Sequence, residues 1–349
     1  MGSDDMSNDW QQFLQSQGAV IQDGIVTHFG NAEAELKQAA SGLIVADLSH
    51  LGLIQFAGEE AQTFLQGQLT NDARLITETA SQFSGYCTPK GRMLATFLMW
   101  LTAPQTYLMQ LPASLQPAIQ KRLSMYVLRS KVKVSDASDA HVRIGLAGAG
   151  ADAALSAAIG VAPQADYAVS KWDGGWVTRL PGGMFVLLLA PSQAAAIWQN
   201  LTTRAKPAGA AVWDWHLIRA GIPNILPATQ EQFVPQMANL DLVGGVNFKK
   251  GCYPGQEIVA RTQYLGKLKR RMYFVHLDNA AEPGTELFSD DFPDQSTGMI
   301  VNAVPSPNGG YDALAVIQIS SAEAHTMHLQ SNTGPTLTLG ALPYPLSTS

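Results

Sequence analysis

The sequence is poor in cysteine, in charged residues and in long apolar runs. Its 349 residues include two cysteines, Cys87 and Cys252, which excludes a disulfide framework and fits a reducing compartment. Charged residues make up 14% of the chain and hydrophobic ones 46%, a composition typical of globular proteins. No apolar run approaches the roughly 20 residues that a membrane span needs, and no charged and then apolar leader opens the chain. We therefore expect a cytoplasmic protein without a membrane partner.

The net charge is −6, which argues against nonspecific nucleic-acid binding by the whole surface. The charge is unevenly spread, because the stretch 249–271 carries seven basic residues and one acid, Glu257, for a local charge of +6. The basic residues are Lys249, Lys250, Arg261, Lys267, Lys269, Arg270 and Arg271. This stretch is either a solvated basic loop or a rim that attracts an anion.

The most specific pattern is KKGCYPGQEIVAR at residues 249–261, in which a thiol follows two lysines and precedes a turn. We expect a helix to start within 254–257, with Pro254 in its first turn. Ammonium groups and the unpaired N–H groups of a helix start both stabilise a thiolate at Cys252. The opposite interpretation is that Cys252 is a small buried hydrophobic residue. The exposure of the thiol decides between the two.

The first two thirds of the chain mix short strands with helices. Strand–helix units at 107–123 and 185–201, with strands at 52–57, 93–101, 141–147 and 176–180 and helices at 9–17 and 59–69, predict an α+β fold with antiparallel sheets. After Gln263, short strand candidates at 272–277, 298–304, 314–320 and 336–339 predict a small all-β barrel or sandwich. We expect an α+β region at 8–265, with two subdomains that divide near 130–150, and a C-terminal β-barrel at 266–349.

The cysteine motif at 249–261 and several other segments resemble those of the YgfZ family, which are bacterial folate-binding proteins related to the aminomethyltransferase (T-protein) of glycine cleavage. Residues 250–257 match the family's K-G-C-Y-x-G-Q-E, and Ala260 and Arg261 match the A-R pair that follows. Segments 65–72 (LQGQLTND), 213–223 (WDWHLIRAGIP) and 233–240 (FVPQMANL) extend the resemblance over nearly the whole chain. The resemblance implies T-protein-like folate-binding domains followed by the small barrel.

The resemblance also implies two sets of site residues and no metal site. The functional thiol is Cys252, and the motif places Lys250, Tyr253, Gly255, Gln256, Glu257 and Arg261 around it. The cofactor, tetrahydrofolate or a derivative, is expected in a central cavity whose walls include Leu51, Asn71, Asp72, Trp213, Arg219 and Gln236. An indole face suits the stacking of a flat ring, although Trp213 would also suit a core position.

The sequence departs from the T-protein pattern in two places. The segment that carries the catalytic aspartate of T-proteins corresponds to residues 91–97, where this chain has Ala95 and Thr96. Without a carboxylate, that place offers no group to hold the ammonium of an aminomethyl intermediate. The acid of the family's I-E-A-G segment is Arg219 here, and an arginine cannot accept the paired hydrogen bonds of a pterin edge. Glu257, Gln236 or Asp72 would have to substitute for it.

The resemblance implies a folate-binding accessory protein that supports iron–sulfur enzymes and thereby tRNA modification, with those enzymes or assembly proteins as partners. One thiol cannot hold a cluster, which needs about four thiolates, so Cys252 would act as a redox or transient ligand thiol. The alternative is a folate-dependent aminomethyltransferase or another C1 transferase, and whether the protein is an enzyme stays open. A third hypothesis is direct tRNA contact through the basic stretch 249–271.

Overall fold

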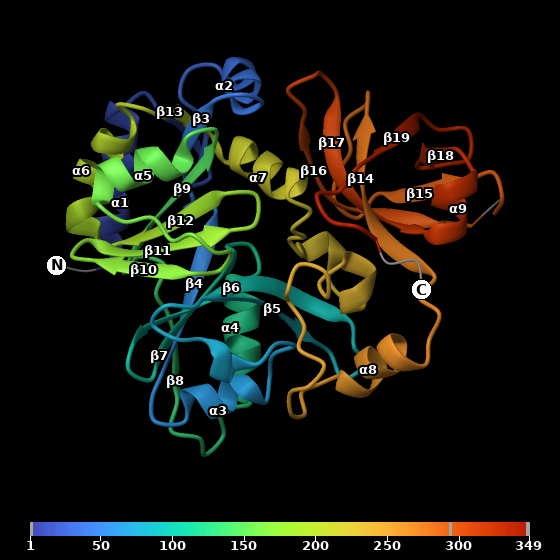
Figure 1. Ribbon diagram of the computed structural model, residues 1–349, viewed down its shortest axis with the longest axis horizontal. Helices are drawn as coiled ribbons and strands as arrows, with labels where there is room; N and C mark the ends of the chain where they lie inside the picture. The colour runs from blue at the N-terminus through green and yellow to red at the C-terminus, as the bar shows by residue number, and fades with distance from the viewer. Residues whose placement is uncertain (1–2, 293–294, 347–349) are drawn as a thin grey trace. The chain divides into compact units, whose positions relative to one another are not determined.

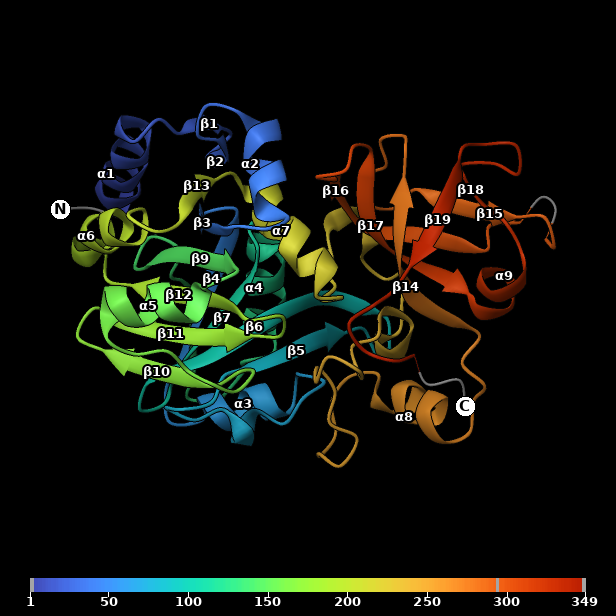
Figure 2. The ribbon, with the colours of Figure 1, turned by 45° about the horizontal axis from the view of Figure 1, so that its top comes forward.

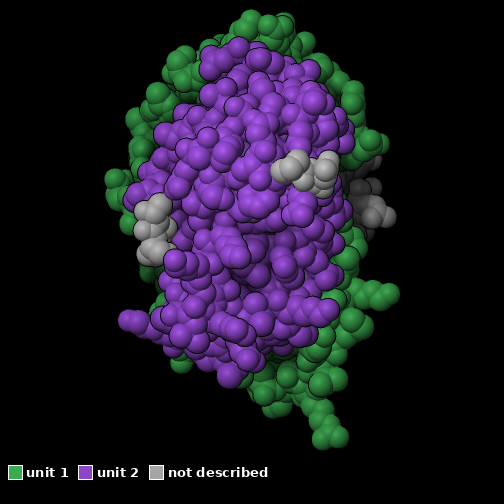
Figure 3. All heavy atoms as spheres, turned by 90° about the vertical axis from the view of Figure 1, so that its right-hand side faces the viewer, with its two compact units in different colours: residues 1–64, 74–82, 98–216 green, residues 65–73, 83–97, 217–349 purple. Residues whose placement is uncertain are grey.

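The computed structural model describes residues 3–292 and 295–346 and divides into two compact units. Within the described residues, unit 1 comprises 3–64, 74–82 and 98–216, and unit 2 comprises 65–73, 83–97 and the residues from 217 onward (Figure 3). Each unit therefore gathers segments that are far apart in the sequence. The expected domain limits, 8–265 and 266–349, stay a prediction, because compactness does not test which parts fold separately.

Unit 1 is built on a six-stranded sheet in the order β10-β11-β12-β9-β3-β13 (Figure 1). Its strands are β3 (Leu43–Asp47), β9 (Val142–Gly148), β10 (Val169–Trp172), β11 (Gly175–Leu180), β12 (Met184–Leu189) and β13 (Lys206–Ala208). All neighbours pair antiparallel except β13 and β3, which are parallel. Side chains of this sheet share one buried core with Trp10, Leu155 and Trp198 of helices α1 (Ser3–Ser16), α5 (Ala151–Ile159) and α6 (Pro191–Leu201).

A second set of antiparallel strands in unit 1 is centred on β4 (Leu51–Ala57). This strand pairs with β7 (Thr106–Pro112) and β8 (Lys133–Asp136), and residues 98–103 of β6 (Met93–Ala103) pair with β7. A ribbon of β1 (Val20–Gln22) and β2 (Ile25–His28) is also present. The remaining helices that begin in unit 1 are α2 (Ala32–Ala39), α3 (Ala61–Gln66), α4 (Gln116–Met125) and α7 (Ala210–Arg219), and α3 is shorter than the expected 59–69.

Unit 2 contains a closed β-barrel in the order β14-β17-β16-β15-β18-β19 (Figure 2). Its strands are β14 (Arg270–Leu277), β15 (Glu286–Ser289), β16 (Gly298–Pro305), β17 (Tyr311–Gln318), β18 (Met327–Leu329) and β19 (Thr336–Gly340). The barrel core is apolar and includes Val275, Ile300, Ile317 and Met327. The predicted α+β architecture with antiparallel sheets and a C-terminal barrel is thus confirmed. Strands β15 and β18 were not predicted, because three or four residues are too short to show an alternating pattern.

The rest of unit 2 consists of short elements. Among them are residues 83–87 of β5 (Gln82–Cys87), the 3-10 helices η2 (Pro227–Thr229) and η3 (Pro235–Ala238), and helices α8 (Gln256–Tyr264) and α9 (Ile319–Ala324). The 3-10 helix η1 (Ala73–Leu75) has only Ala73 in unit 2. Across the residues that the structure describes, no helix has the length and hydropathy to cross a bilayer.

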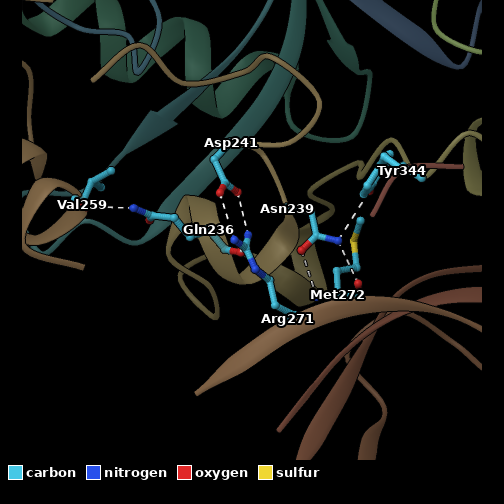
Figure 4. Close-up of polar contacts among 8 residues, drawn as sticks. Gln236, Asn239, Asp241, Val259, Arg271, Met272 and Tyr344 are labelled. Atoms are coloured by element: carbon cyan, nitrogen blue, oxygen red, sulfur yellow. Dashed lines mark hydrogen bonds and ion pairs between the residues drawn. The ribbon is translucent and has the colours of Figure 1, made fainter. Parts of the chain in front are cut away.

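Asn239 joins η3 to the first barrel strand. Its φ is 55°, a left-handed conformation that asparagine adopts more readily than most residues. The fully buried side chain donates from Nδ2 to Met272 O at 2.8 Å and accepts at Oδ1 from Met272 N at 3.3 Å (Figure 4). Asn239 therefore makes with Met272 of β14 the two backbone hydrogen bonds that a neighbouring strand would otherwise make.

We expect Asn239→Ala to lower the free energy of unfolding by about 2–4 kcal/mol, because it leaves two buried backbone groups unpaired and places alanine in a left-handed conformation. Asn239→Gly removes the same hydrogen bonds without the conformational cost and should destabilise by about 1 kcal/mol less. Urea denaturation measures both. A loss below about 0.5 kcal/mol, the range of ordinary surface substitutions, would contradict this role for Asn239.

Candidate functional site

Two glycines bring the cysteine motif against the turn that follows β5. Gly255 is the N-cap of α8 with φ 82°, and a Cβ there would lie 2.5 Å from Thr88 O and 2.6 Å from Gly91 N. Gly91 has φ +71°, and a Cβ there would lie 3.0 Å from the Cβ of Ile258. A Cβ at Gly255 would overlap backbone and one at Gly91 would crowd the Ile258 side chain, and both positive φ values also favour glycine. A glycine is therefore needed at position 255 because the motif makes a close contact there with the turn at 88–91.

The helix begins at Gln256, inside the expected range of 254–257. Pro254 lies in the turn ahead of the N-cap and not in the first helical turn, so that detail of the prediction is wrong. The reason is that Gly255 takes the left-handed conformation, which separates Pro254 from the helix. The Gln256 backbone N–H donates to Tyr253 O at 3.1 Å, and its side chain donates to Lys250 O at 3.4 Å. These two hydrogen bonds of Gln256 therefore stabilise the turn formed by residues 250–256.

Lys250 is buried, with 5% of its surface exposed. Its ammonium donates to Gln66 O at 2.7 Å and to Leu69 O, and lies 4.9 Å from the ring centroid of Tyr253. These carbonyls are at the end of α3 and just beyond it, 184 and 181 residues away in the sequence. Lys250 therefore anchors the loop, whereas Lys249 is exposed.

Tyr253 and Cys87 lie under the loop. Tyr253 is buried, and burial raises the pKa of its hydroxyl, with a smaller contribution from nearby Cys87. Cys87 is also buried, and burial alone raises the pKa of its thiol to about 12. Cys87 is consequently a neutral packing residue at physiological pH.

Cys252 itself is exposed, between exposed Gly251 and buried Tyr253. This exposure favours the interpretation as an accessible thiol over that of a buried hydrophobic residue. Glu257 and Arg261 are exposed on α8, and among the described residues no ion pair joins them, although their spacing allows one. Their roles in the site stay predictions.

The basic stretch 249–271 is not uniformly a surface rim. Lys249, Arg261, Lys267 and Lys269 are exposed and Arg270 is partly exposed. Lys250 and Arg271 are buried and are held by hydrogen bonds within unit 2. The expected rim of seven cations therefore contains five, because two of them satisfy carbonyl and carboxylate groups of the fold.

Two of the expected folate-site residues belong to unit 1. Leu51 opens β4 and is buried, and Trp213 of α7 has only 1% of its surface exposed. The Trp213 ring packs on Gly145 of β9, where a Cβ would lie 2.5 Å from the indole. Its Nε1 donates to no partner within the described part of the chain.

Asn71 and Asp72 lie in unit 2, and the Asn71 amide is occupied by the fold. Its Nδ2 donates to Phe83 O at 2.9 Å and to Gly244 O at 2.7 Å, and its Oδ1 accepts from Asp72 N at 2.9 Å. Both amide hydrogens of Asn71 are thus in use. Asp72 is buried with 6% of its surface exposed.

Arg219 and Gln236, also in unit 2, differ in their surroundings. Arg219 is exposed, and its guanidinium carbon lies 4.5 Å from the ring centroid of Phe274 on β14. Gln236 is buried, and its Nε2 donates to Val259 O at 2.8 Å (Figure 4). Its Oε1 accepts no hydrogen bond from any residue that the structure describes.

Thr96 is one of the two residues, with Ala95, that the sequence comparison expects in place of the T-protein aspartate. Its buried hydroxyl donates to Pro223 O at 3.0 Å and accepts from Ile225 N at 3.1 Å. The hydroxyl therefore connects β6 to the segment 223–225, and it carries no charge with which to hold an ammonium group.

The expected folate-site residues offer polar groups that suit a pterin. Trp213 Nε1 is a buried donor without a partner in unit 1, and Gln236 Oε1 is a buried acceptor without one in unit 2. Buried polar atoms in proteins normally have partners, and a pterin carries both donors and acceptors. The residues present thus fit the cofactor to this extent.

Comparisons with known proteins first define the class. The family described as GCVT N-terminal domain matches residues 11–171. The glycine cleavage system aminomethyltransferase T from Bartonella henselae superposes with a TM-score of 0.78 and 18% identity, covering 96% of each chain. The protein therefore has the aminomethyltransferase (GCVT) fold.

Curated proteins are similar to this chain over most of its length. The chain is 27% identical over 323 residues to a protein named tRNA-modifying protein YgfZ from Pectobacterium carotovorum subsp. carotovorum, covering 90% of this chain and 96% of that one. The protein of the same name from Yersinia pseudotuberculosis serotype O:1b is 28% identical over 319 residues, covering 88% and 95%. The expected resemblance to the YgfZ family is confirmed, and the chain is a homologue of these proteins.

Sequence reasoning missed a buried ion pair next to the motif helix. Arg271 donates to both carboxylate oxygens of Asp241, at 2.8 and 3.1 Å, and to Gln236 O at 2.8 Å (Figure 4). From the sequence alone Arg271 belongs with the surface cations, because a run of basic residues does not show which of them is buried. An arginine on an apolar strand, next to Met272, is the signal that could have indicated burial.

We expect iodoacetamide at pH 8 to modify Cys252 and to leave Cys87 unmodified in the folded protein. The Cys87 pKa is raised to about 12, so its thiol stays protonated at this pH as well as being inaccessible. Mass spectrometry of peptides after a short labelling time measures both sites. Equal modification of the two cysteines before denaturation would contradict this, and labelling in urea is the positive control for Cys87.

Lys250→Met should lower the free energy of unfolding by about 2–4 kcal/mol, because two carbonyls would lose a charged donor. The matched control Lys249→Met changes an exposed neighbour and should stay within about 0.5 kcal/mol of the wild type. Chemical denaturation of both variants tests the anchoring role. Equal stabilities would show that the Lys250 contacts contribute nothing.

Proposed function

We propose that this protein binds folate and supports iron–sulfur enzymes, and thereby tRNA modification, with Cys252 as its functional thiol. The observation that carries the proposal is the exposure of Cys252 on a loop that burial of Lys250 and Tyr253 and the close contact of Gly255 hold in place. The name that these relatives carry, tRNA-modifying protein YgfZ, supports the tRNA part. The aminomethyltransferase fold supports the folate part. A reducing cytoplasm is the compartment that suits a free thiol.

The role of Cys252 follows from its isolation. A cluster needs about four thiolates, and the other cysteine of the chain is buried. Cys252 would therefore exchange with a partner's thiol or ligate its metal transiently. The conformation of the loop is held by contacts of Lys250, Tyr253, Gly255 and Gln256. Two further residues of the motif, Glu257 and Arg261, are exposed on α8.

Tetrahydrofolate or a derivative, when bound, would supply a one-carbon unit or the redox chemistry of the reduced pterin. Trp213 of unit 1 can offer its indole N–H, or Gln236 of unit 2 its amide oxygen, as a partner for the ring. Asn71 is less suited to contact a ligand through its amide hydrogens, because both already serve Phe83 O and Gly244 O. Leu51, Asp72 and Arg219 remain candidates for the walls.

The alternative function, aminomethyl transfer, is disfavoured by Thr96. A reaction that develops an ammonium next to folate needs a nearby carboxylate, and the Thr96 hydroxyl is already committed to two backbone groups. Contact with tRNA through the exposed cations Lys249, Arg261, Lys267 and Lys269 is a further part of the proposal. The iron–sulfur enzyme or assembly protein that Cys252 would meet is the partner.

Two measurements test the proposal. Calorimetric titration with tetrahydrofolate, 5-formyltetrahydrofolate and their polyglutamates should show saturable binding. In a strain that lacks the protein, Cys87→Ser should restore the activity of an iron–sulfur tRNA-modifying enzyme, and Cys252→Ser should reduce it at least about tenfold, because the nucleophile or ligand is removed. Full complementation by Cys252→Ser, or no folate binding, would overturn the respective part. Formation of methylenetetrahydrofolate from an aminomethylated carrier would support the alternative.

A further inference from the structure

Unit 2 contains a pocket of about 530 Å³, and of the residues assigned above to the folate and thiol sites Gln236 alone is in its lining. Its walls include Thr262 near the end of α8, Leu268 in the following loop, and Gln236, Asp241 and Phe248, and all its lining residues belong to unit 2. This volume is in the range of small-molecule sites.

The pocket wall offers three hydrogen-bond acceptors. Gln236 gives one hydrogen of its Nε2 to Val259 O, its Oε1 has no partner among the described residues, and 1% of the residue's surface is exposed. Thr262 gives its hydroxyl hydrogen to Ile258 O at 2.8 Å, which leaves acceptor capacity on that oxygen. Asp241 is a carboxylate that accepts from Arg271. A ligand that pairs with Gln236 Oε1 must bring a donor.

The charges and the apolar walls restrict the ligand further. The ionisable residues in the lining are Asp241, Glu323, Lys267 and Arg271, which sum to zero, so a neutral ligand fits better than a polyanion. Phe248, Leu242, Leu268 and Ile319 supply apolar surface. The Phe248 ring meets Tyr264 edge to face at 6.2 Å, a contact that holds its orientation. A flat apolar body with N–H groups on its edge matches this combination.

We propose that this pocket binds a neutral planar heterocycle with an exocyclic amino group, whose N–H donates to Gln236 Oε1. Two sources share this chemistry: a purine or pyrimidine base, and the pterin head of a folate. The second source rests on the proposed function, and the first does not. In either case Gln236 contributes the acceptor, and the ring lies against Phe248 and Leu268.

Pairs of probes that differ in the amino group test the proposal on the unaltered protein. Guanosine is compared with inosine, and pterin with lumazine, by calorimetry or saturation-transfer NMR. The amino-bearing member of at least one pair should bind about tenfold more tightly, because its partner leaves the Gln236 acceptor unpaired. Leu268→Trp fills the pocket and should abolish that binding, and the matched control Leu265→Trp, at a fully solvent-facing position of the same loop, should retain it.

The outcomes separate this proposal from the proposed function. A guanosine preference that Leu268→Trp removes identifies a nucleobase site, and a pterin preference with the same dependence identifies a folate site. No discrimination within either pair, or a folded Leu268→Trp that binds like the wild type, overturns the proposal. Tetrahydrofolate binding that persists in Leu268→Trp, without guanosine binding, overturns this inference alone. Guanosine binding with no folate binding overturns the folate part of the proposed function alone.

Discussion

The arrangement of the cysteine motif depends on one backbone contact, between Gly255 and the turn at Thr88–Gly91. A side chain on either glycine would overlap backbone or α8, so the two turns approach only because both positions lack a Cβ. This contact sets where α8 begins and hence which residues of the motif turn inward. Lys250 and Tyr253 point into unit 2, and Cys252 is left in solvent. Preorganisation of an exposed thiol on a fixed loop is what a functional cysteine requires.

Buried polar contacts likewise fix the first barrel strand, β14, against the segment 236–241. Asn239 substitutes for a strand partner of Met272, and Arg271 joins Asp241 to the Gln236 carbonyl. These groups are expensive to bury unless paired, so each must be satisfied in one geometry only. The first barrel strand is thereby held in register with the segment 236–241. The same segment lines the pocket beside α8, so the contacts that position the barrel also shape that pocket.

The fold is similar to that of an aminomethyltransferase. A fold does not define an activity, because activity depends on the side chains at the site. Residues 95–96 include no acid, and the Thr96 hydroxyl is hydrogen-bonded to Pro223 O and Ile225 N. The guanidinium of Arg219 lies over the ring of Phe274. The proposed accessory role rests on the exposed thiol of Cys252 near exposed cations, because such a group suits transient contact with a partner.

The sequence by itself determined the element types, the antiparallel sheets, the barrel and the motif, because hydrophobic periodicity and turn residues are local signals. It also showed that residues 95–96 lack an acid. Only the tertiary structure decided that Lys250 and Arg271 are buried, that Gly255 pairs with Gly91 and that Gln236 keeps an unpartnered acceptor. The short strands β15 and β18 also emerged only there. The physical reason is distance along the chain: Lys250 binds carbonyls more than 180 residues away, and no local pattern records a partner that only folding brings near.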